Sequence, residues 1–307
     1  MLGRMDTTSP AESRRARARR RAGEFPPAPE PLAVPVFDSH THLDITVHEA
    51  GVPGGSAGDP AEAADQVEAL IDAAAKAGVD RLVQVGVDVA SSRWGAQLAA
   101  RHPAVLATVA LHPNEAPVLA DLDEALRAIE ALAAEPRVRG IGETGLDTFR
   151  TGADGRAAQE ESFRAHIAIA KRYGKPLIIH DRDAHDDVLR VLDAEGAPDT
   201  VVLHCFSGDA GFAAECVRRG YLLSFAGVVT FASAGDLRAA AALTPPEQML
   251  VETDAPYLTP MPYRGQPNAS YLIPLTVRAL AEAAGADLDT LCATISATGD
   301  RVFGPWR

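Results

Sequence analysis

Short apolar runs alternate with longer amphipathic stretches along the chain from Val34 onward. Each run is a nearly continuous series of apolar residues. Runs of this kind are typical of strands in a parallel sheet that is covered on its outer face. We therefore predict eight buried strands, within residues 35–43, 79–87, 105–113, 138–147, 176–182, 200–208, 221–229 and 249–258.

The stretches between these runs carry apolar residues at helical spacing. In residues 63–78, Val67, Leu70 and Ile71 fall on one helical face, and Gly78 ends the pattern. Strands that alternate with helices in this way predict an α/β protein with a (β/α)8 TIM barrel. An open doubly wound sheet is the alternative, but no GxGxxG motif follows the first run, which disfavours it.

The first 33 residues differ in composition from the rest of the chain. They hold clusters of arginine followed by prolines, with almost no apolar side chains. Such a segment cannot bury enough apolar surface to fold. We therefore predict a disordered Arg/Pro-rich tail over residues 1–33 and a single barrel domain over residues 34–307.

The composition and net charge of the chain disfavour several classes of protein. The chain has 307 residues and a formal net charge of −13, which disfavours broad wrapping of duplex DNA but leaves room for nucleic acid held by bound cations. No stretch approaches the roughly 20 apolar residues of a membrane span. The three cysteines form no CxxC pair, which suits a reducing compartment, so we expect a cytoplasmic protein. No membrane association and no obligate protein partner are expected.

Polar residues with metal-binding side chains recur at the predicted carboxyl ends of the strands, where TIM barrels place their chemistry. Any one of these histidines alone is better explained as a hydrogen-bonded loop residue. Five converging histidines with two acids need partners, because each unsatisfied buried polar group costs about 1–3 kcal/mol. The chain's nine histidines include four others, His48, His102, His166 and His185, to which we assign no role. The strand-end set is His40, His42, His112, Glu143, His180, His204 and Asp254.

The donor set narrows the metal and its chemistry. Imidazole and carboxylate without thiolate suit zinc, manganese, iron, cobalt or nickel, with magnesium possible at an oxygen-rich position. We predict that His40, His42, Glu143 and Asp254 hold one ion, and that His180 and His204 hold a second, with Glu143 as the bridge. Two ions about 3.5–4 Å apart can activate water for hydrolysis of a phosphoester, an amide or an acyl ester.

Taken together, the motifs resemble the TatD family of metal-dependent deoxyribonucleases, which are amidohydrolase-like barrels. The resemblance implies a (β/α)8 barrel, two divalent ions (magnesium, manganese or zinc) and hydrolysis of DNA phosphodiesters, commonly by 3′–5′ exonuclease action on ends or single strands. It also matches His40, His42, Glu143, His180, His204 and Asp254 to the family's metal ligands. The matching stretches, in family order, are FDSHTHLD, ALHPN, IGETGLD, PLIIHDRDA, VLHCFSG, SFAGVVTF and ETDAPYLTPMPYRGQPN.

Roles can be assigned to individual residues as hypotheses. We expect Asp254 to accept the proton of the attacking water, and Glu143 to bridge the ions. His112 is a candidate contact for the scissile phosphate, with a structural hydrogen bond as the alternative. The candidate substrate contacts are Arg182, Arg264 and Asn268, for which surface salt bridges are the alternative to phosphate or sugar binding.

Two other classes of function remain open from the residues alone. One is a metal-dependent hydrolase of a C–N or acyl ester bond, of the amidohydrolase or aminoacyl-tRNA deacylase type, which would use the same donors. The other is a non-catalytic barrel, which the presence of all six ligands disfavours. Thr148, Phe149 and Ala269 depart from the family's usual pattern, and they lie on the expected substrate side.

Overall fold

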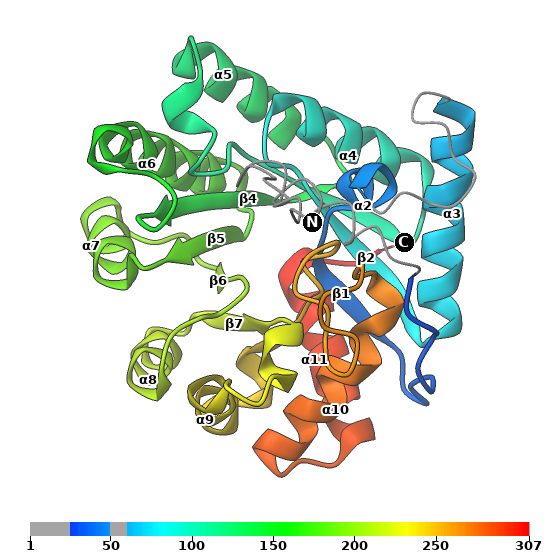
Figure 1. The fold of residues 1–307 in the computed structure, drawn as a ribbon. Coiled ribbons are helices and arrows are strands. Elements are labelled where there is room, and N and C mark those ends of the chain that lie inside the picture. Colours follow the sequence, from blue (N-terminus) through cyan, green and yellow to red (C-terminus); the bar gives the residue numbers. More distant parts are fainter. Residues whose placement is uncertain (1–24, 50–59, 307) are drawn as a thin grey trace, which may run out of the picture.

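The computed structural model describes residues 25–49 and 60–306. Its centre is one eight-stranded parallel sheet, in which each strand pairs with the next along the chain (Figure 1). Every predicted apolar run contains one of these strands, and helices lie between them, so the predicted (β/α)8 barrel is confirmed. The strands are β1 (Val36–Thr41), β2 (Val79–Val85), β3 (Val105–Val109), β4 (Val138–Asp147), β5 (Leu177–Arg182), β6 (Val201–Leu203), β7 (Leu222–Phe225) and β8 (Met249–Val251).

The first and last strands meet at their carboxyl ends. Thr41 and Ala255 form a parallel bridge there. The His42 amide donates to the Ala255 carbonyl at 3.0 Å, and the Asp254 amide donates to the His40 carbonyl at 2.9 Å. Backbone pairing therefore brings two histidines and an aspartate from opposite ends of the sequence to one place.

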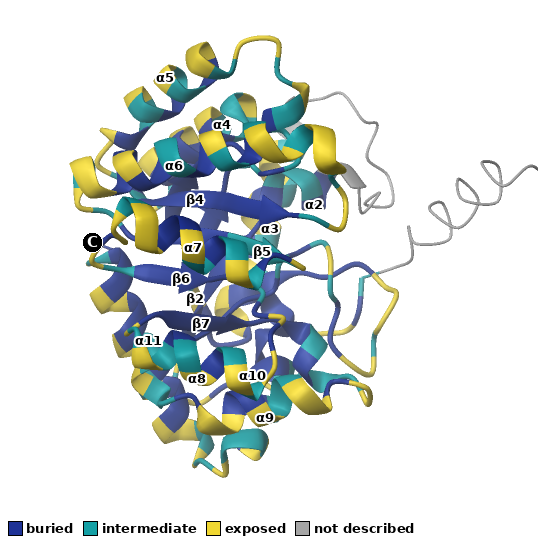
Figure 2. Cartoon of the chain, turned by 90° about the vertical axis from the view of Figure 1, so that its left-hand side faces the viewer, coloured by how far each residue is buried: buried dark blue, intermediate teal, exposed yellow. Residues whose placement is uncertain are grey.

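Helices surround the sheet and turn their apolar faces toward it, so that the strands are buried and the outer helical faces are exposed (Figure 2). Aspartate side chains cap the amino ends of α4, α5, α8 and α11 by accepting backbone N–H groups. Gly174 ends α6 in the left-handed conformation, which glycine adopts without steric cost. The helices are α2 (Leu43–Glu49), α3 (Pro60–Lys76), α4 (Val89–Arg101), α5 (Leu122–Ala133), α6 (Arg156–Tyr173), α7 (His185–Glu195), α8 (Ala210–Arg218), α9 (Gly235–Leu243), α10 (Ile273–Ala284) and α11 (Leu288–Phe303).

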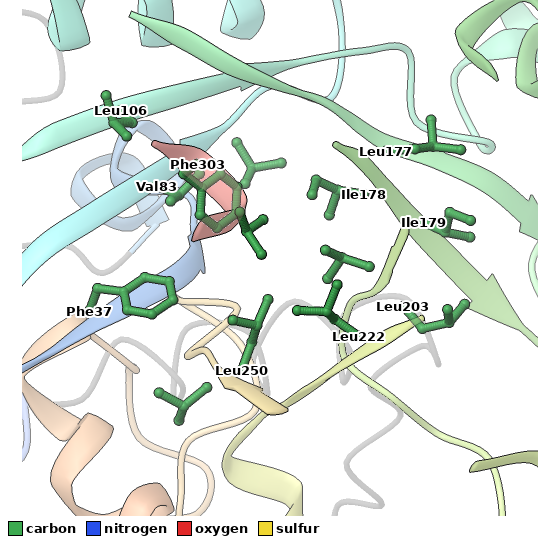
Figure 3. Close-up of a cluster of buried hydrophobic side chains, with 14 of the residues drawn as sticks. Phe37, Val83, Leu106, Leu177, Ile178, Ile179, Leu203, Leu222, Leu250 and Phe303 are labelled. Carbon is green, nitrogen blue, oxygen red and sulfur yellow. The ribbon is translucent and has the colours of Figure 1, made fainter. Parts of the chain in front are cut away.

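Apolar side chains fill the space inside the barrel and between the strands and helices (Figure 3). Near the amino end of β1, the Phe37 ring lies 6.1 Å from the Phe303 ring and 5.7 Å from the Trp306 ring, measured between centroids. The last helix and the segment after it thus pack against the first strand. These aromatic side chains lie at the amino end of the barrel, and the polar residues of the predicted set lie at its carboxyl end.

The part of the predicted tail that the structure describes, residues 25–33, packs against the barrel. Leu32 is buried, the Tyr271 hydroxyl donates to the Pro26 carbonyl at 2.6 Å, and Arg278 donates to the Glu30 carbonyl at 2.9 Å. An extended proline-rich backbone offers free carbonyls, and these hold it in place although it has few apolar side chains. The packed region therefore begins at Phe25 and not at Val34, and the rest of the predicted tail lies outside the described residues.

Two expectations from composition concern membranes and disulfides. None of the described helices is long and apolar enough to cross a bilayer. Cys205, Cys216 and Cys292 are unpaired. Since the formation of disulfides depends on the redox compartment, free thiols agree with the sparse and unpatterned cysteines of the sequence.

Candidate metal centre

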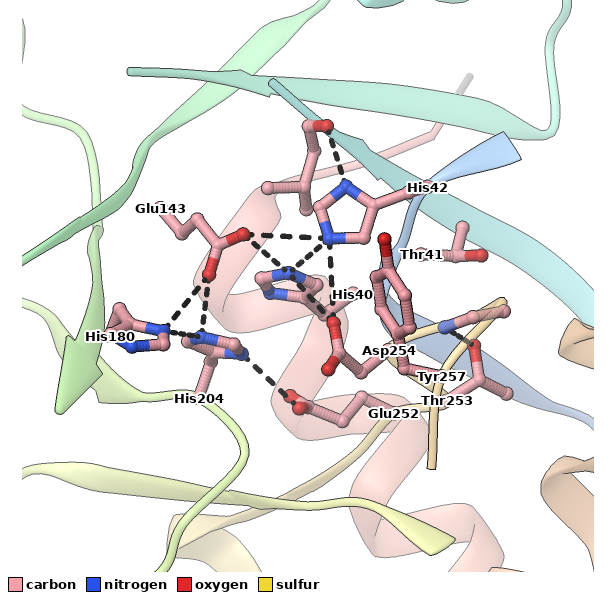
Figure 4. A network of polar contacts seen from close by, with 12 residues as sticks. His40, Thr41, His42, Glu143, His180, His204, Glu252, Thr253, Asp254 and Tyr257 are labelled. Atoms are coloured by element: carbon pink, nitrogen blue, oxygen red, sulfur yellow. Dashed lines mark hydrogen bonds and ion pairs between the residues drawn. The ribbon is translucent and has the colours of Figure 1, made fainter. Parts of the chain in front are cut away.

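The seven strand-end residues predicted from the sequence converge at the carboxyl end of the barrel. Figure 4 shows six of them around a common centre, on side chains from β1, β4, β5 and the ends of β6 and β8. Their metal-binding atoms lie within 2.8–3.8 Å of one another across the contacts of the cluster. Parallel strands that all end at one face explain why residues far apart in sequence meet here.

The carboxylate of Glu143 divides the cluster into two groups of donors. Its Oε1 lies 3.5 Å from His42 Nε2 and 3.7 Å from His40 Nε2. Its Oε2 lies 2.8 Å from His204 Nε2 and 3.4 Å from His180 Nδ1. Each oxygen therefore faces a different pair of imidazoles, which is the arrangement that a bridging carboxylate needs.

Asp254 completes the first group. His42 Nε2 lies 3.4 Å from its Oδ1, and His40 Nε2 lies 3.8 Å from the same oxygen. The two imidazole Nε2 atoms are 3.3 Å apart. The Asp254 backbone has a positive φ of 53°, which points to a position fixed by its surroundings.

These spacings fit a divalent metal ion. Four ligands placed about 2.0–2.2 Å from a tetrahedral zinc ion are separated from each other by roughly 3.3–3.6 Å. Several donor pairs in the cluster are separated by distances at or near this range. These distances are too long for strong hydrogen bonds. The donors are nitrogen and oxygen only, as divalent hydrolytic metals prefer. The residues present therefore fit a metal centre, with His40, His42 and Asp254 on one side of Glu143.

Charges in the cluster are mutually stabilised despite deep burial. Burial raises the pKa of Glu143, but the neighbouring histidines His204, His112 and His180 together outweigh it and hold that pKa well below its usual value. Burial likewise raises the pKa of Asp254, but His42, His40 and His204 together lower it on balance. Burial lowers the pKa of His42, yet Asp254 and Glu143 raise it to about 9. Ionised carboxylates beside protonated imidazoles are a state in which a metal ion can replace the protons.

His112 differs from the other imidazoles. Burial lowers its pKa to about 4, so its ring is neutral at pH 7. Its Nδ1 accepts the Asn114 backbone N–H at 3.0 Å, which leaves the proton of the neutral ring on Nε2. That Nε2 lies 3.8 Å from Glu143 Oε2, at the edge of the second donor group.

A family model described as TatD related DNase matches residues 37–304, which span nearly all of the barrel and every residue of the cluster. The chain belongs to this family. It is therefore a metal-dependent hydrolase of the nuclease class, and the resemblance noted in its motifs is confirmed.

Individual TatD relatives agree with this assignment. The chain is 48% identical over 273 residues to an uncharacterized metal-dependent hydrolase TatD of Mycobacterium tuberculosis, covering 88% of this chain and 98% of the relative. It is 36% identical over 236 residues to a 3′-5′ ssDNA/RNA exonuclease TatD of Citrobacter rodentium, covering 74% of this chain and 88% of the relative. The solved structure of YjjV, a TatD homologue from Escherichia coli K12, superposes with a TM-score of 0.77 at 26% identity, covering 87% of this chain and 97% of that one.

Two buried carboxylates of this TatD chain were missed from the sequence. Glu252 Oε1 lies 3.3 Å from His204 Nδ1, and Asp147 Oδ2 lies 3.4 Å from His180 Nε2. Each contacts the imidazole nitrogen that faces away from Glu143, where a carboxylate orients a ligand and raises its basicity. The available signal was their place at the same strand ends, in VETD and GETGLD.

Asp38, on the first strand, connects β1 to the end of β8. Its carboxylate accepts the Thr253 hydroxyl at 2.6 Å and the Thr253 and His40 backbone N–H groups at 3.0 and 3.2 Å. It therefore ties the end of β8 to β1. Burial raises the pKa of Asp38 to about 7, against these hydrogen bonds.

The three predicted substrate contacts of the TatD chain differ in exposure. Asn268 is fully buried, and its amide donates to the Thr253 carbonyl at 2.9 Å and the Tyr257 carbonyl at 2.6 Å. It therefore braces the loop after β8, and the prediction of a substrate contact does not fit this geometry. Arg264 is exposed and Arg182 is half-buried, with their guanidinium groups over the rings of Phe231 and Phe149.

Proposed function

We propose that this protein is an exonuclease that removes nucleotides from the 3′ ends of single-stranded DNA with two divalent metal ions. The observation that carries the two-ion proposal is that the two carboxylate oxygens of Glu143 face separate groups of imidazoles. The substrate class is supported by TatD relatives at 36% and 34% identity whose names are 3′-5′ ssDNA/RNA exonuclease.

His40, His42 and Asp254 would hold one ion and His180 and His204 the other, with Glu143 between them. When bound, the ions supply Lewis acidity and neutralise charge that develops on the phosphoryl oxygens. The protein keeps the donors dry and fixed, since their side chains are at most 17% exposed. A fixed polar site surrounded by little water strengthens each interaction with the substrate phosphate.

Asp254 accepts the proton of the attacking water in this proposal. Its side chain is 17% exposed, whereas that of Glu143 is 5% exposed, so Asp254 is the carboxylate of the cluster that water reaches more readily. Water attacks phosphorus, its proton passes to an Asp254 oxygen, and the bond from phosphorus to the leaving oxygen breaks. Carboxylates are common acceptors in such steps.

His112 donates a hydrogen bond to the scissile phosphate. Because the Asn114 N–H occupies Nδ1, the Nε2–H of the neutral ring points toward the cluster. Its low pKa keeps the ring in this form throughout the neutral range. A fixed donor of this kind stabilises charge on a phosphoryl oxygen without adding a net charge to the site.

The experiment is a turnover screen of the metal-loaded protein. The substrates are end-labelled single-stranded DNA, RNA, an aryl phosphodiester and an aryl ester. We expect cleavage of the DNA that shortens it from the 3′ end and stops when the metal is chelated. Cleavage of the aryl ester alone would contradict the proposal and favour a hydrolase of acyl or C–N bonds built on the same donors.

A further inference from the structure

The ring of Phe149 is an exposed aromatic side chain near the metal centre. Phe149 is 64% exposed, although a phenylalanine of this size is usually buried. Its backbone N–H donates to Asp147 Oδ1 at 3.0 Å, and the other oxygen of Asp147 lies 3.4 Å from His180 Nε2. The same carboxylate therefore positions both the exposed ring and one imidazole of the cluster.

A guanidinium group packs on this ring. The central carbon of Arg182 lies 4.3 Å from the centroid of the Phe149 ring, a short cation–π distance. The backbone of β5 holds the arginine in place, since its carbonyl accepts the Thr148 N–H at 3.0 Å. Arg182 follows His180 by two residues, so the pair stands at the ends of the strands that carry Glu143 and His180.

No group in residues 25–49 and 60–306 occupies the N–H donors of Arg182. Within the described residues, its side chain has no hydrogen bond and no carboxylate within 4 Å. Other arginines on the outer helices behave differently, for example Arg190 and Arg219, whose donors are taken by acidic neighbours. An arginine with a planar fork of unused N–H groups is suited to phosphate oxygens.

We propose that Phe149 and Arg182 form a nucleobase subsite at the edge of the metal centre. A base of the single strand stacks on the open face of Phe149, while Arg182, which covers part of the ring, donates to the neighbouring backbone phosphate. Stacking of this kind tolerates any base, because every base has a π-face. The inference rests on the proposed nuclease function and names how its substrate is held.

A second arginine–aromatic pair on the same end of the barrel lacks this feature. The Arg264 guanidinium lies 4.4 Å from the centroid of Phe231, but the Phe231 side chain is only half-exposed at the end of a short helical turn. It offers less open ring for a base. The geometry therefore favours the pair after β4 and β5 as the stacking site.

The test combines a variant of the protein with a variant of the substrate. In Phe149→Ala we expect KM for a single-stranded oligonucleotide to rise roughly 5- to 150-fold, the range that loss of one base–aromatic stack gives, with kcat nearly unchanged. Phe149→Trp keeps a larger ring and should restore a KM near that of the original protein. Leu243→Ala is the control, because Leu243 is also an exposed apolar residue but lies at the end of α9, before β8 begins.

Abasic nucleotides placed singly at each of the last few 3′ positions identify the stacked base. At one position the abasic substrate should raise KM for the original protein as much as Phe149→Ala does, and should add nothing further in Phe149→Ala. Arg182→Lys should raise KM for every one of these oligonucleotides, wherever the abasic nucleotide stands, because lysine keeps the charge but lacks the planar fork of arginine. An active enzyme in which Phe149→Ala behaves like Leu243→Ala would overturn the subsite alone. An original protein that leaves every oligonucleotide intact would overturn the nuclease proposal, and the subsite with it.

Discussion

Most imidazoles of the cluster present one nitrogen to its centre and use the other for a contact with the surrounding protein. Among the described residues, His40 Nδ1 and His180 Nε2 form no hydrogen bond, but His180 Nε2 lies 3.4 Å from Asp147 Oδ2. Contacts of this kind fix the tautomer and the direction of a ligand before any metal binds. The outward contacts are His42 Nδ1 with the Val85 carbonyl, His204 Nδ1 with Glu252, His180 Nε2 with Asp147 and His112 Nδ1 with the Asn114 N–H.

Glu252 offers a test of this orientation at a single residue. Replacing it as Glu252→Gln keeps the size of the side chain but removes the charge that faces His204. We predict a loss of metal affinity of about 10- to 100-fold, because such carboxylates raise the basicity of the histidine they contact. Competition with a chromophoric chelator measures the change.

Glu282→Gln, on the exposed face of α10, makes the same substitution far from the centre and serves as the control for Glu252→Gln. Its metal affinity should equal that of the original protein. Equal affinities in all three proteins would show that Glu252 does not act on the metal site.

Asp254 offers a test of the proton acceptor. Asp254→Asn retains an oxygen donor but accepts a proton far less readily, so we predict that kcat falls by about 10²- to 10⁴-fold. Elemental analysis of the same sample shows whether the ions remain bound. Asp44→Asn is the matched control, since Asp44 lies on the same end of the barrel and its carboxylate accepts a hydrogen bond from the Gln84 amide at 2.9 Å. Turnover near that of the original protein with metal still present would rule out the assigned role.

The sequence predicted the cluster better than it predicted its surroundings. Strand ends placed His40 and the other members of the set correctly, because side chains at the ends of parallel strands must meet. Glu252 and Asp147 escaped notice, since their role depends on which way each imidazole turns. Asn268 was misjudged because an amide that binds substrate and one that holds backbone carbonyls look alike in sequence.

At the scale of elements, two of the strands stop just before the residues that they carry into the site. β6 ends at Leu203 and β8 at Val251, directly or shortly before His204 and Asp254. Beyond the end of the strand the backbone can adopt irregular conformations, such as the positive φ of Asp254. These conformations direct side chains into the mouth of the barrel. The sequence pattern predicted where these strands lie, but periodicity carries no information on such local dihedral angles.

The end of β3 is held by a helix through His166, for which no role was predicted from the sequence. His166 lies buried on α6, accepts the Leu111 N–H on Nε2 at 3.0 Å and donates from Nδ1 to the Ser162 carbonyl at 2.7 Å. Leu111 immediately precedes His112, so the helix fixes the segment that carries the proposed phosphate contact. A buried histidine in helical spacing is indistinguishable from any other core residue until its partners are known.

His166 predicts a dependence of stability on pH. Burial lowers its pKa to about 4, whereas the unfolded chain has the ordinary value near 6.5. Below pH 6.5 the imidazole of His166 is protonated in the unfolded state, whereas in the folded state it is protonated only near pH 4. His166 therefore favours unfolding increasingly as the pH falls through this window. We expect this residue to account for about 3 kcal/mol of lost stability between these limits.

Urea unfolding of the original protein and of His166→Gln between pH 4.5 and 8 measures this effect. Glutamine can keep a donor and an acceptor but does not titrate, so the free energy of unfolding of the variant should fall less steeply with acid. Parallel curves for the two proteins would contradict the assignment to His166.

At the scale of the molecule, the amino-terminal and carboxyl-terminal parts of the chain complete the barrel. Residues 25–33 lie against α10 and the loop before it, and Trp306 packs on Phe37 of the first strand. The barrel and its order of strands followed from the alternation of apolar runs. The packing of residues 25–33 did not, because it depends on backbone carbonyls and the partners that Tyr271 and Arg278 provide.

Two divalent ions at the mouth of the barrel are the foundation of the proposed function. Anomalous diffraction from crystals of the protein saturated with manganese or zinc locates such ions directly. We predict two peaks about 3.5–4 Å apart, one on each side of the Glu143 carboxylate. The first should lie among His40, His42 and Asp254, and the second beside His180 and His204. Metal-saturated crystals with no peak within reach of these side chains would contradict the proposed two-metal centre.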